Sequence, residues 1–430
     1  MDTPATELSD LPLSGDARLA RTAFSRKVAL SLMMFLQHAS MGAWIPIMPL
    51  HLQDIGFSGT QIGIAFATFS LASLASPWLV GELADRLFSA RSVLAGSHAL
   101  GAALLWWTAS ATAPHAVLAL IAANALVFVP TLAVSNFLVL RNLADRYREF
   151  GYVRLWGTAS WVVVGALLGL WLQKPGWVLP QRPAVLADGL RFGALLSVLL
   201  VPCCFLLPAT QPIRAPCATR FASASALRML RNRPFLVLVL ASLAASFASP
   251  FVYPVGGLYL RSLGVSDANV APLLSLGQAG EVAALLGLGW AVTRFGFKPV
   301  FLVGLAAWTV RFAIWIVAAP WPLVAASLPL HGLCYACVFV LGQMYADAHA
   351  APDSRTSAQS LHLFLTSGIG ALAGNVAAGY GVDCFTPLSA SGEPQSLGLI
   401  FVGPAVGTLA AFVLFATAFK PTTPAARPPD

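Results

Sequence analysis

Long apolar stretches separated by short polar segments occupy most of this 430-residue chain. A helix that crosses the hydrocarbon core of a membrane needs about 20 mostly apolar residues. Twelve stretches satisfy this requirement, and two proline-rich segments, 173–185 and 384–396, are expected to form loops. The pattern therefore predicts an all-α membrane protein. The expected spans are 28–50, 60–80, 92–110, 115–139, 153–172, 189–208, 234–260, 268–292, 298–318, 320–345, 357–380 and 396–418.

The longest polar segment between spans, 209–233, divides them into six and six. After its second span each half has a glycine followed five residues later by an arginine, Gly81 with Arg86 and Gly289 with Arg294. These elements lie 208 residues apart, and such an internal repeat predicts two six-helix bundles related by an axis along the membrane normal. The expected parts are a tail 1–27, a first bundle 28–208, a linker 209–233, a second bundle 234–418 and a tail 419–430.

The positive charges gather in alternate polar segments. With the N-terminus in the cytoplasm, 19 of the 25 Lys and Arg residues fall in cytoplasmic segments and 4 in the opposite loops. Inserted proteins carry this excess on the cytoplasmic side, so both termini are predicted to be cytoplasmic. The polar start of the chain is unlike a cleavable signal peptide, so the first span is expected to act as the insertion signal.

Composition excludes a water-soluble protein. The chain is 58% hydrophobic and 10% charged, whereas soluble domains carry about 25% charged residues, so membrane lipid is the expected surrounding. A net charge of +8 would suggest nucleic acid in a soluble protein, but here the positive residues lie between spans and no nucleic-acid partner is expected. Cys334 and Cys337 have CxxC spacing within an apolar span, where packing of small residues explains them better than redox chemistry.

Few charged residues lie within the predicted spans, and such residues usually line a cavity or pair with each other. They are Arg154, Glu281 and Arg311. Arg154 could instead reach the cytoplasmic surface, and Arg311 could brace the bundle by pairing with Glu281 or with carbonyl groups. Histidines at similar depth could carry protons or form hydrogen bonds between helices. These histidines are His38, His98, His331 and His362.

Gln278 and Glu281 are three residues apart and share one face of the eighth span. A carboxamide beside a carboxylate can bind hydroxyl groups or the edge of a base, and the carboxylate can also exchange a proton. The alternative is that Glu281 only neutralises an arginine. The sequence has no metal-ligand cluster, phosphate-binding loop or nucleophile–base pair, so we expect no enzyme activity, no cofactor and no metal site.

Six plus six helices with Gly81-Glu-Leu-Ala-Asp-Arg86 after the second span resemble the major facilitator superfamily. Pro130-Thr-Leu-Ala-Val-Ser-Asn136, followed by Arg154-Leu-Trp-Gly-Thr-Ala-Ser-Trp161, is similar to the nucleoside:proton symporter family. The likeness extends over nearly all of the membrane domain. Further matches are Phe35-Leu-Gln37, Gly42-Ala-Trp44, Gly277-Gln-Ala-Gly-Glu281 and Arg355-Thr-Ser-Ala-Gln359.

This resemblance implies the major facilitator fold and proton-coupled nucleoside uptake by alternating access, in a monomer in the bacterial inner membrane. Arg154, Thr158 and Trp161 fall on one helical face by their i, i+4, i+7 spacing, and the family uses this face to contact the nucleoside. From the residues themselves, we expect Glu281 to couple protons with His331 as an accessory site, and we expect Asp85 and Arg86, between the second and third spans, to act in gating or bracing. The full set of implied substrate-binding residues is Arg154, Thr158, Trp161, Gln278, Glu281, His331 and Tyr335.

Two positions depart from the family pattern. Ala336 stands where the tenth span is expected to have an aspartate, and the segment 248–254 of the seventh span lacks the amide residues that some members have there. We therefore carry no role to the seventh span. A symporter or facilitator for sugars, oligosaccharides or small aromatic acids is the alternative, and a sensor or scaffold on the same fold is a second one.

Overall fold

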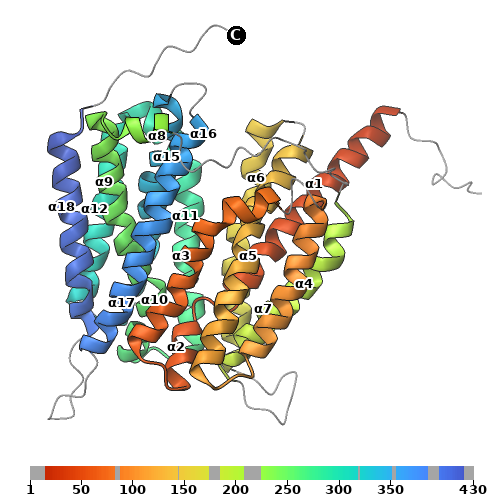
Figure 1. Ribbon diagram of the computed structural model, residues 1–430, viewed down its shortest axis with the longest axis horizontal. Coiled ribbons are helices and arrows are strands. Elements are labelled where there is room, and N and C mark those ends of the chain that lie inside the picture. Colours follow the sequence, from red (N-terminus) through yellow and green to blue (C-terminus); the bar gives the residue numbers. More distant parts are fainter. Residues whose placement is uncertain are drawn as a thin grey trace, which may run out of the picture.

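The computed structural model describes residues 15–82, 88–143, 145–173, 185–207, 224–317, 320–350, 355–385 and 397–420, and nearly all of them are helical (Figure 1). The helices of the first half are α1 (Gly15–Gly42), α2 (Met48–Asp54), α3 (Gly59–Glu82), α4 (Ala90–Thr108), α5 (Pro114–Asn142), α6 (Arg146–Gln173) and α7 (Ala187–Phe205).

The second half begins with α8 (Ala224–Met229), which lies within the predicted linker. Several spans of this half are divided into shorter segments. Its other elements are α9 (Arg233–Ala248), η3 (Ser249–Phe251), α10 (Tyr253–Ser262), α11 (Asp267–Phe295), α12 (Phe297–Ile316), α13 (Trp321–Ser327), α14 (Leu330–Cys334), η4 (Tyr335–Val340), α15 (Leu341–His349), α16 (Arg355–Leu363), η5 (Phe364–Gly370), α17 (Ala371–Phe385), η6 (Leu397–Phe401) and α18 (Val402–Ala418).

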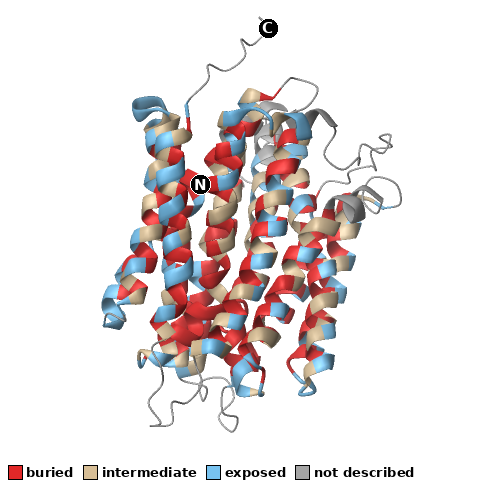
Figure 2. Cartoon of the chain, turned by 60° about the vertical axis from the view of Figure 1, so that its left-hand side comes forward, coloured by how far each residue is buried: buried red, intermediate tan, exposed pale blue. Residues whose placement is uncertain are grey.

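Nine helical runs among the described residues are long and apolar enough to cross a membrane. The three other predicted spans coincide with α1 and α2, with α3, and with α4. Buried and exposed positions alternate along the helices in Figure 2, and large apolar side chains such as Leu286 and Trp290 are exposed. Contact of such an apolar surface with lipid tails is favourable, whereas its exposure to water would be unfavourable.

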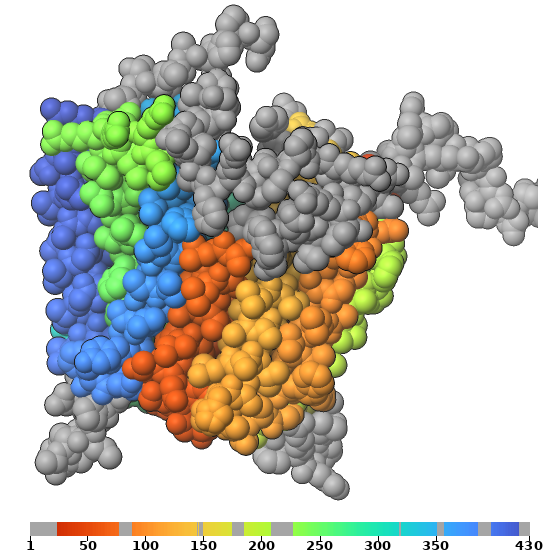
Figure 3. All heavy atoms as spheres, viewed as in Figure 1, coloured from red at the N-terminus to blue at the C-terminus, as the bar shows by residue number. Residues whose placement is uncertain are grey.

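The helices form two groups that correspond to the two halves of the chain (Figure 1). In the first group α1 packs on α6 and α7, and α4 packs on α5 and α7. In the second group α18 packs on α9 and α12. The groups meet along two seams, one between α3 and α17 and the other between α6 and α11. Figure 3 shows α3 and α17 side by side at the lower part of the interface.

Glycines allow the close approach of the backbones at both seams. A Cβ atom on Gly63 of α3 would lie 2.5 Å from the carbonyl oxygen of Asn375 and 2.9 Å from Cα of Gly379 in α17. A Cβ atom on Gly169 of α6 would lie 2.5 Å from the ring of Pro272 in α11. Small residues at such contacts are the usual means of packing helices tightly in membranes.

The seams are fastened by polar groups at one end, drawn at the bottom of Figure 1, which we call the sealed end. Arg261, in the last turn of α10, donates to Asp54 of α2 at 2.8 Å, and Asp383 of α17 accepts from the backbone amides of Gly59 and Thr60 at 2.5 and 2.8 Å. Gln173 of α6 donates to Asn269 of α11 at 2.9 Å. α1 begins and α18 ends at the opposite end, which we call the terminal end.

Candidate transport site

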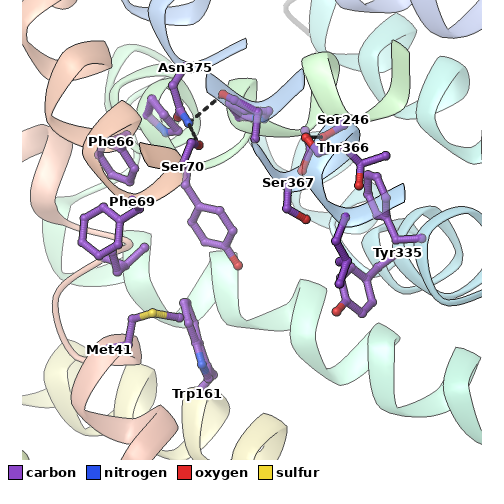
Figure 4. Close-up of a pocket in the computed structure, with 18 of the residues that line it drawn as sticks. Met41, Phe66, Phe69, Ser70, Trp161, Ser246, Tyr335, Thr366, Ser367 and Asn375 are labelled. Atoms are coloured by element: carbon purple, nitrogen blue, oxygen red, sulfur yellow. Dashed lines mark hydrogen bonds between the residues drawn. The ribbon is translucent and has the colours of Figure 1, made fainter. Parts of the chain in front are cut away.

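A cavity of about 370 Å³ lies between the two helix groups (Figure 4). Trp161 and Tyr335, two of the predicted substrate-binding residues, line it. None of the lining residues carries a charge. They are Met41, Ile45, Phe66, Phe69, Ser70, Trp161, Ser246, Ser249, Pro250, Tyr253, Pro254, Tyr335, Phe339, Gln343, Leu363, Thr366, Ser367, Ala371 and Asn375.

The seventh span contributes to the cavity because its helix is interrupted. α9 ends at Ala248, a 3-10 turn follows, and α10 begins at Tyr253. Pro250 lies in this break and Pro254 in the first turn of α10, and because proline has no amide hydrogen it disrupts the regular hydrogen bonding of a helix. Sequence reasoning assigned no role to this span, yet Tyr253 and Ser249 line the cavity. The two prolines were the available signal for the break.

Tyr253 connects both helix groups at the cavity. Gln278 of α11 donates through Nε2 to its hydroxyl oxygen at 3.0 Å. Its ring centroid lies 5.8 Å from that of Trp161 in α6 and 6.5 Å from that of His331 in α14. The predicted residues Trp161, Gln278 and His331 are therefore brought together around a tyrosine that the sequence analysis did not select.

The fifth-span stripe divides into a cavity-lining part and a buried part. Trp161 lines the cavity, whereas Thr158 is buried and is not among the lining residues. Arg154 is half-buried and lies beside His38 of α1, since a Cβ atom on Gly157 would be 2.8 Å from both Arg154 Nη1 and His38 Nδ1. The stripe thus follows α6 from the cavity toward the terminal end of the first group.

Glu281 is 7% exposed and has no hydrogen bond or ion pair with any described residue. It interacts electrostatically with Arg154 across the seam between α6 and α11. Arg311 does not pair with Glu281, which was one of the alternatives: it lies 5.0 Å over the ring of Trp315, and its Nη1 is 3.3 Å from Nδ1 of His331.

The tenth span turns Tyr335 into the cavity and Ala336 away from it. Tyr335 is 37% exposed and its ring stacks at 6.4 Å on His331, while Ala336 is fully buried in the apolar core. Residues Tyr335–Val340 form a π-helix, in which a turn contains more residues than in an α-helix. Phe339, four residues after Tyr335, also lines the cavity, whereas Ala336 does not. The family resemblance had suggested position 336 as the cavity-facing equivalent of the expected aspartate.

The histidines have different surroundings. His98 donates from Nε2 to Oε1 of Gln37 at 2.7 Å and lies 3.3 Å from Oγ of Ser197, while Gln37 donates to Thr131 at 2.7 Å. This network joins four helices of the first group, as expected for hydrogen bonds between helices. Both ring nitrogens of His362 are buried without a partner in the described part of the chain.

Other predictions concern groups outside this cavity. Asp85 and Arg86, expected to act in gating, lie outside the described residues. Within the described ranges there is no cluster of three or more His, Cys, Asp or Glu side chains placed to hold a metal ion. Sequence reasoning also missed the polar lining residues of the second and eleventh spans, such as Ser70 and Ser367, because single serines and amides in a span carry no periodic signal.

Two packed helix groups with one site between them define a membrane carrier of the major facilitator class. The family model described as nucleoside H+ symporter matches residues 24–424, so the chain belongs to that family.

The sequences of known relatives match this chain along most of their length. YegT of Escherichia coli strain K12 is 32% identical over 360 residues, which cover 80% of this chain and 82% of YegT. The nucleoside permease NupG of the same organism is 26% identical over 415 residues, 90% of this chain and 95% of NupG. Two crystal structures of the nucleoside transporter NupG, one of them a mutant, have TM-scores of 0.78 and 0.81 at 23% identity. They cover 92% of this chain and 99% and 100% of their own, which shows a common fold.

Proposed function

We propose that this protein takes up nucleosides together with protons by alternating access, with the cavity between the helix groups as its transport site. The observation that carries the proposal is the combination of aromatic rings from both groups, Trp161, Tyr253 and Tyr335, in one uncharged cavity. A nucleobase that stacks on an aromatic side chain gains about 1–3 kcal/mol. Membership of the nucleoside H+ symporter family supports the substrate class.

Within this proposal the polar groups of α11 complete the base site. Gln278 already donates to the hydroxyl of Tyr253, and a nucleobase could replace that partner because a carboxamide both donates and accepts. Thr158 and Arg154 extend the same helical face beyond Trp161 toward the terminal end. Glu281 and His331 lie close to the tyrosines of the cavity.

Alternating access requires the two seams to open and close in turn. The hydrogen bonds and ion pairs recorded between described residues of the two groups lie at the sealed end or beside the cavity. We therefore assign this conformation to the inward-facing state, with the sealed end outside the cell and the terminal end in the cytoplasm. The positive charges of the terminal segments support this orientation.

Proton coupling is assigned to Glu281, with His331 as an accessory site. Glu281 is buried, has no hydrogen-bond partner among the described residues and interacts electrostatically with Arg154. It would bind a proton in the outward-facing state and release it inward as Arg154 approaches, since an approaching cation favours the ionised carboxylate. The protein is proposed to act as a monomer in the bacterial inner membrane.

Uptake into proteoliposomes tests the function directly. Purified protein should concentrate labelled uridine or adenosine when the pH outside is lower than inside, and collapse of the gradient should abolish accumulation. Unlabelled nucleosides should compete, and lactose should not. Competition by lactose or by an aromatic acid, with none by nucleosides, would identify the alternative substrates, and no uptake of any substrate would favour a sensor or scaffold.

A further inference from the structure

The cavity has two walls of different chemistry. The first helix group supplies an almost wholly apolar wall, with Met41, Phe69 and Trp161 among its members. The second group supplies hydroxyl and amide side chains from three spans (Figure 4). They are Ser246, Ser249, Gln343, Thr366, Ser367 and Asn375. A substrate with one aromatic face and one hydroxyl-rich part would match this division.

Half of these polar groups are already occupied. Ser246 donates to the carbonyl oxygen of Thr366 at 2.6 Å, and Thr366 donates to that of His362 at 2.7 Å. The amide nitrogen of Asn375 donates to the carbonyl oxygen of Ala371 at 2.8 Å and to Oγ of Ser70 at 3.3 Å. The bonds of Ser246 and Thr366 fix the backbone of the wall, and Asn375 ties it to α3.

The side chains of the other three, Ser249, Gln343 and Ser367, have no hydrogen-bond partner among the described residues. Gln343 and Ser367 are the two that lie outside the break in the seventh span. Ser367 is exposed and, in Figure 4, lies on the same side of the cavity as Tyr335 and across from Trp161. A neutral amide and a neutral hydroxyl that remain available inside a carrier are suited to an uncharged ligand with adjacent hydroxyl groups.

The backbone explains how Ser367 comes to face the cavity. Residues Phe364–Gly370 form a π-helix, the second one that borders this cavity. A π segment changes the direction of the side chains that follow it, and such segments are frequent at functional sites. Gly370 packs on Ser246, and Gly368 approaches Leu74 of α3, so the segment is held from both sides.

We propose that Gln343 and Ser367 bind the ribose hydroxyls of the nucleoside and so select ribonucleosides over their deoxy analogues. This inference rests on the proposed function, since it assigns the sugar subsite of the same cavity. The absence of charged residues among the lining side chains points to a neutral polyol rather than a phosphate or a carboxylate. With the base between Trp161 and the tyrosines, the sugar lies against α15 and η5.

The test combines variants that lack one of these side chains with ligands that lack one or both ribose hydroxyl groups. Uptake or binding of uridine, 2′-deoxyuridine, 3′-deoxyuridine and 2′,3′-dideoxyuridine is measured for the wild type and for Ser367→Ala and Gln343→Leu. A neutral hydrogen bond in this setting changes affinity by about 3- to 10-fold. Each variant should lose that much for uridine and less than about twofold for the dideoxy analogue.

Two further variants separate recognition from folding. Ser367→Thr keeps the hydroxyl and should retain the preference for uridine. Ser73→Ala removes a hydroxyl of α3 that donates to its own helix at 2.9 Å and does not line the cavity, so it should behave as the wild type. Equal losses for uridine and dideoxyuridine, or no loss for either, would overturn the sugar subsite while nucleoside uptake remains. A wild-type protein that takes up no nucleoside would instead refute the proposed function.

Discussion

The spans of the first bundle after α2 are uninterrupted helices, whereas the seventh, tenth and eleventh spans of the second bundle are divided by 3-10 or π segments. The difference extends to the side chains. Gln37 and His98 of the first bundle hydrogen-bond each other in its interior, while Gln343 and Ser367 of the second are left available at the cavity. The first bundle therefore presents Trp161 on a largely apolar wall, and the second supplies most of the polar side chains that line the cavity.

The comparison also explains how a membrane protein can use irregular backbone. An unpaired backbone group in lipid costs several kcal/mol, so interrupted helices are tolerated only where protein or a cavity surrounds them. Both π segments and the break at Ser249 border the cavity. Carbonyl groups that lose their regular helical partner can accept from nearby side chains instead. The carbonyl oxygen of Thr366, for example, accepts a hydrogen bond from the hydroxyl of Ser246.

The largest expected effect is on the coupling of transport to the proton gradient, through Glu281 at the seam between α6 and α11. Glu281→Gln mimics the protonated carboxyl, so the variant should retain nucleoside binding and exchange but lose all accumulation driven by a pH gradient. Counterflow and gradient-driven uptake in proteoliposomes measure the two separately. Glu149→Gln, which removes the partner of Lys27 near the terminal end, is the matched control. A folded Glu281→Gln protein that still concentrates nucleoside would refute the role of Glu281.

The next effect concerns the aromatic surface that the first bundle presents. Trp161→Ala should weaken nucleoside binding about 10-fold or more, because base stacking is worth about 1–3 kcal/mol. Trp161→Phe should retain most of the affinity, and Thr158→Val should have a smaller effect because Thr158 lies outside the lining. Trp290→Ala, at an exposed tryptophan of α11, is the control. Unchanged affinity in Trp161→Ala would mean that the ring only packs against Gly42, whose added Cβ would lie 3.1 Å away.

A third experiment tests whether the first bundle is a support rather than a recognition element. His98→Leu leaves Gln37 and Ser197 without their partner, and a buried polar group that loses its hydrogen bond costs about 1–3 kcal/mol. We expect a lower melting temperature in detergent with nucleoside affinity within about twofold of wild type. His115→Leu, at an exposed position of α5, should change neither quantity. A large loss of affinity at unchanged stability would place His98 in substrate recognition instead.

The smallest expected effect is on the sealed end. Asp383→Asn removes a negative charge from the N-terminus of α3. The interaction of such a charge with the helix dipole contributes about 0.3–1 kcal/mol, so the seam between α3 and α17 should open about 2- to 5-fold more often at the sealed end. A cysteine placed at Ser249 in a cysteine-free background reports this by labelling from the sealed side. Asp347→Asn, which affects a contact with Gln359 inside the second bundle, is the control. An unchanged labelling rate would mean that the other contacts of the sealed end, such as the glycine packing and the Arg261–Asp54 pair, keep it closed without the charge of Asp383.

The ion pairs of the sealed end should not themselves respond to pH in the range used for transport. Hydrogen bonds to Asp267 and Asp54 raise the pKa of Arg261 above its already high usual value. A raised pKa of a basic group means that its stabilisation is lost only as the pH rises past that value. Arg261 therefore stays charged between about pH 5 and pH 8, where histidines and perturbed carboxyls titrate. Pronounced pH dependence of transport in this range would then come from other groups, such as Glu281 and His331.

The sequence by itself determined the membrane class, the helical runs, the repeat of two bundles and the family. These follow from local quantities, since a run of about 20 apolar residues must cross the membrane as a helix whatever lies around it. The family resemblance also selected Trp161 and Tyr335, and both line the cavity.

Only the tertiary structure decided which faces meet. Tyr253, Gln343 and Ser367 line the cavity, and each lies in or beside a 3-10 or π segment, which changes the direction of side chains from that of a regular helix. Ala336 lies in the apolar core. Those segments persist because packing between bundles holds them, as Gly368 against Leu74 illustrates. Contacts between residues nearly 300 positions apart have no signal in a single sequence, and they set the shape of the site.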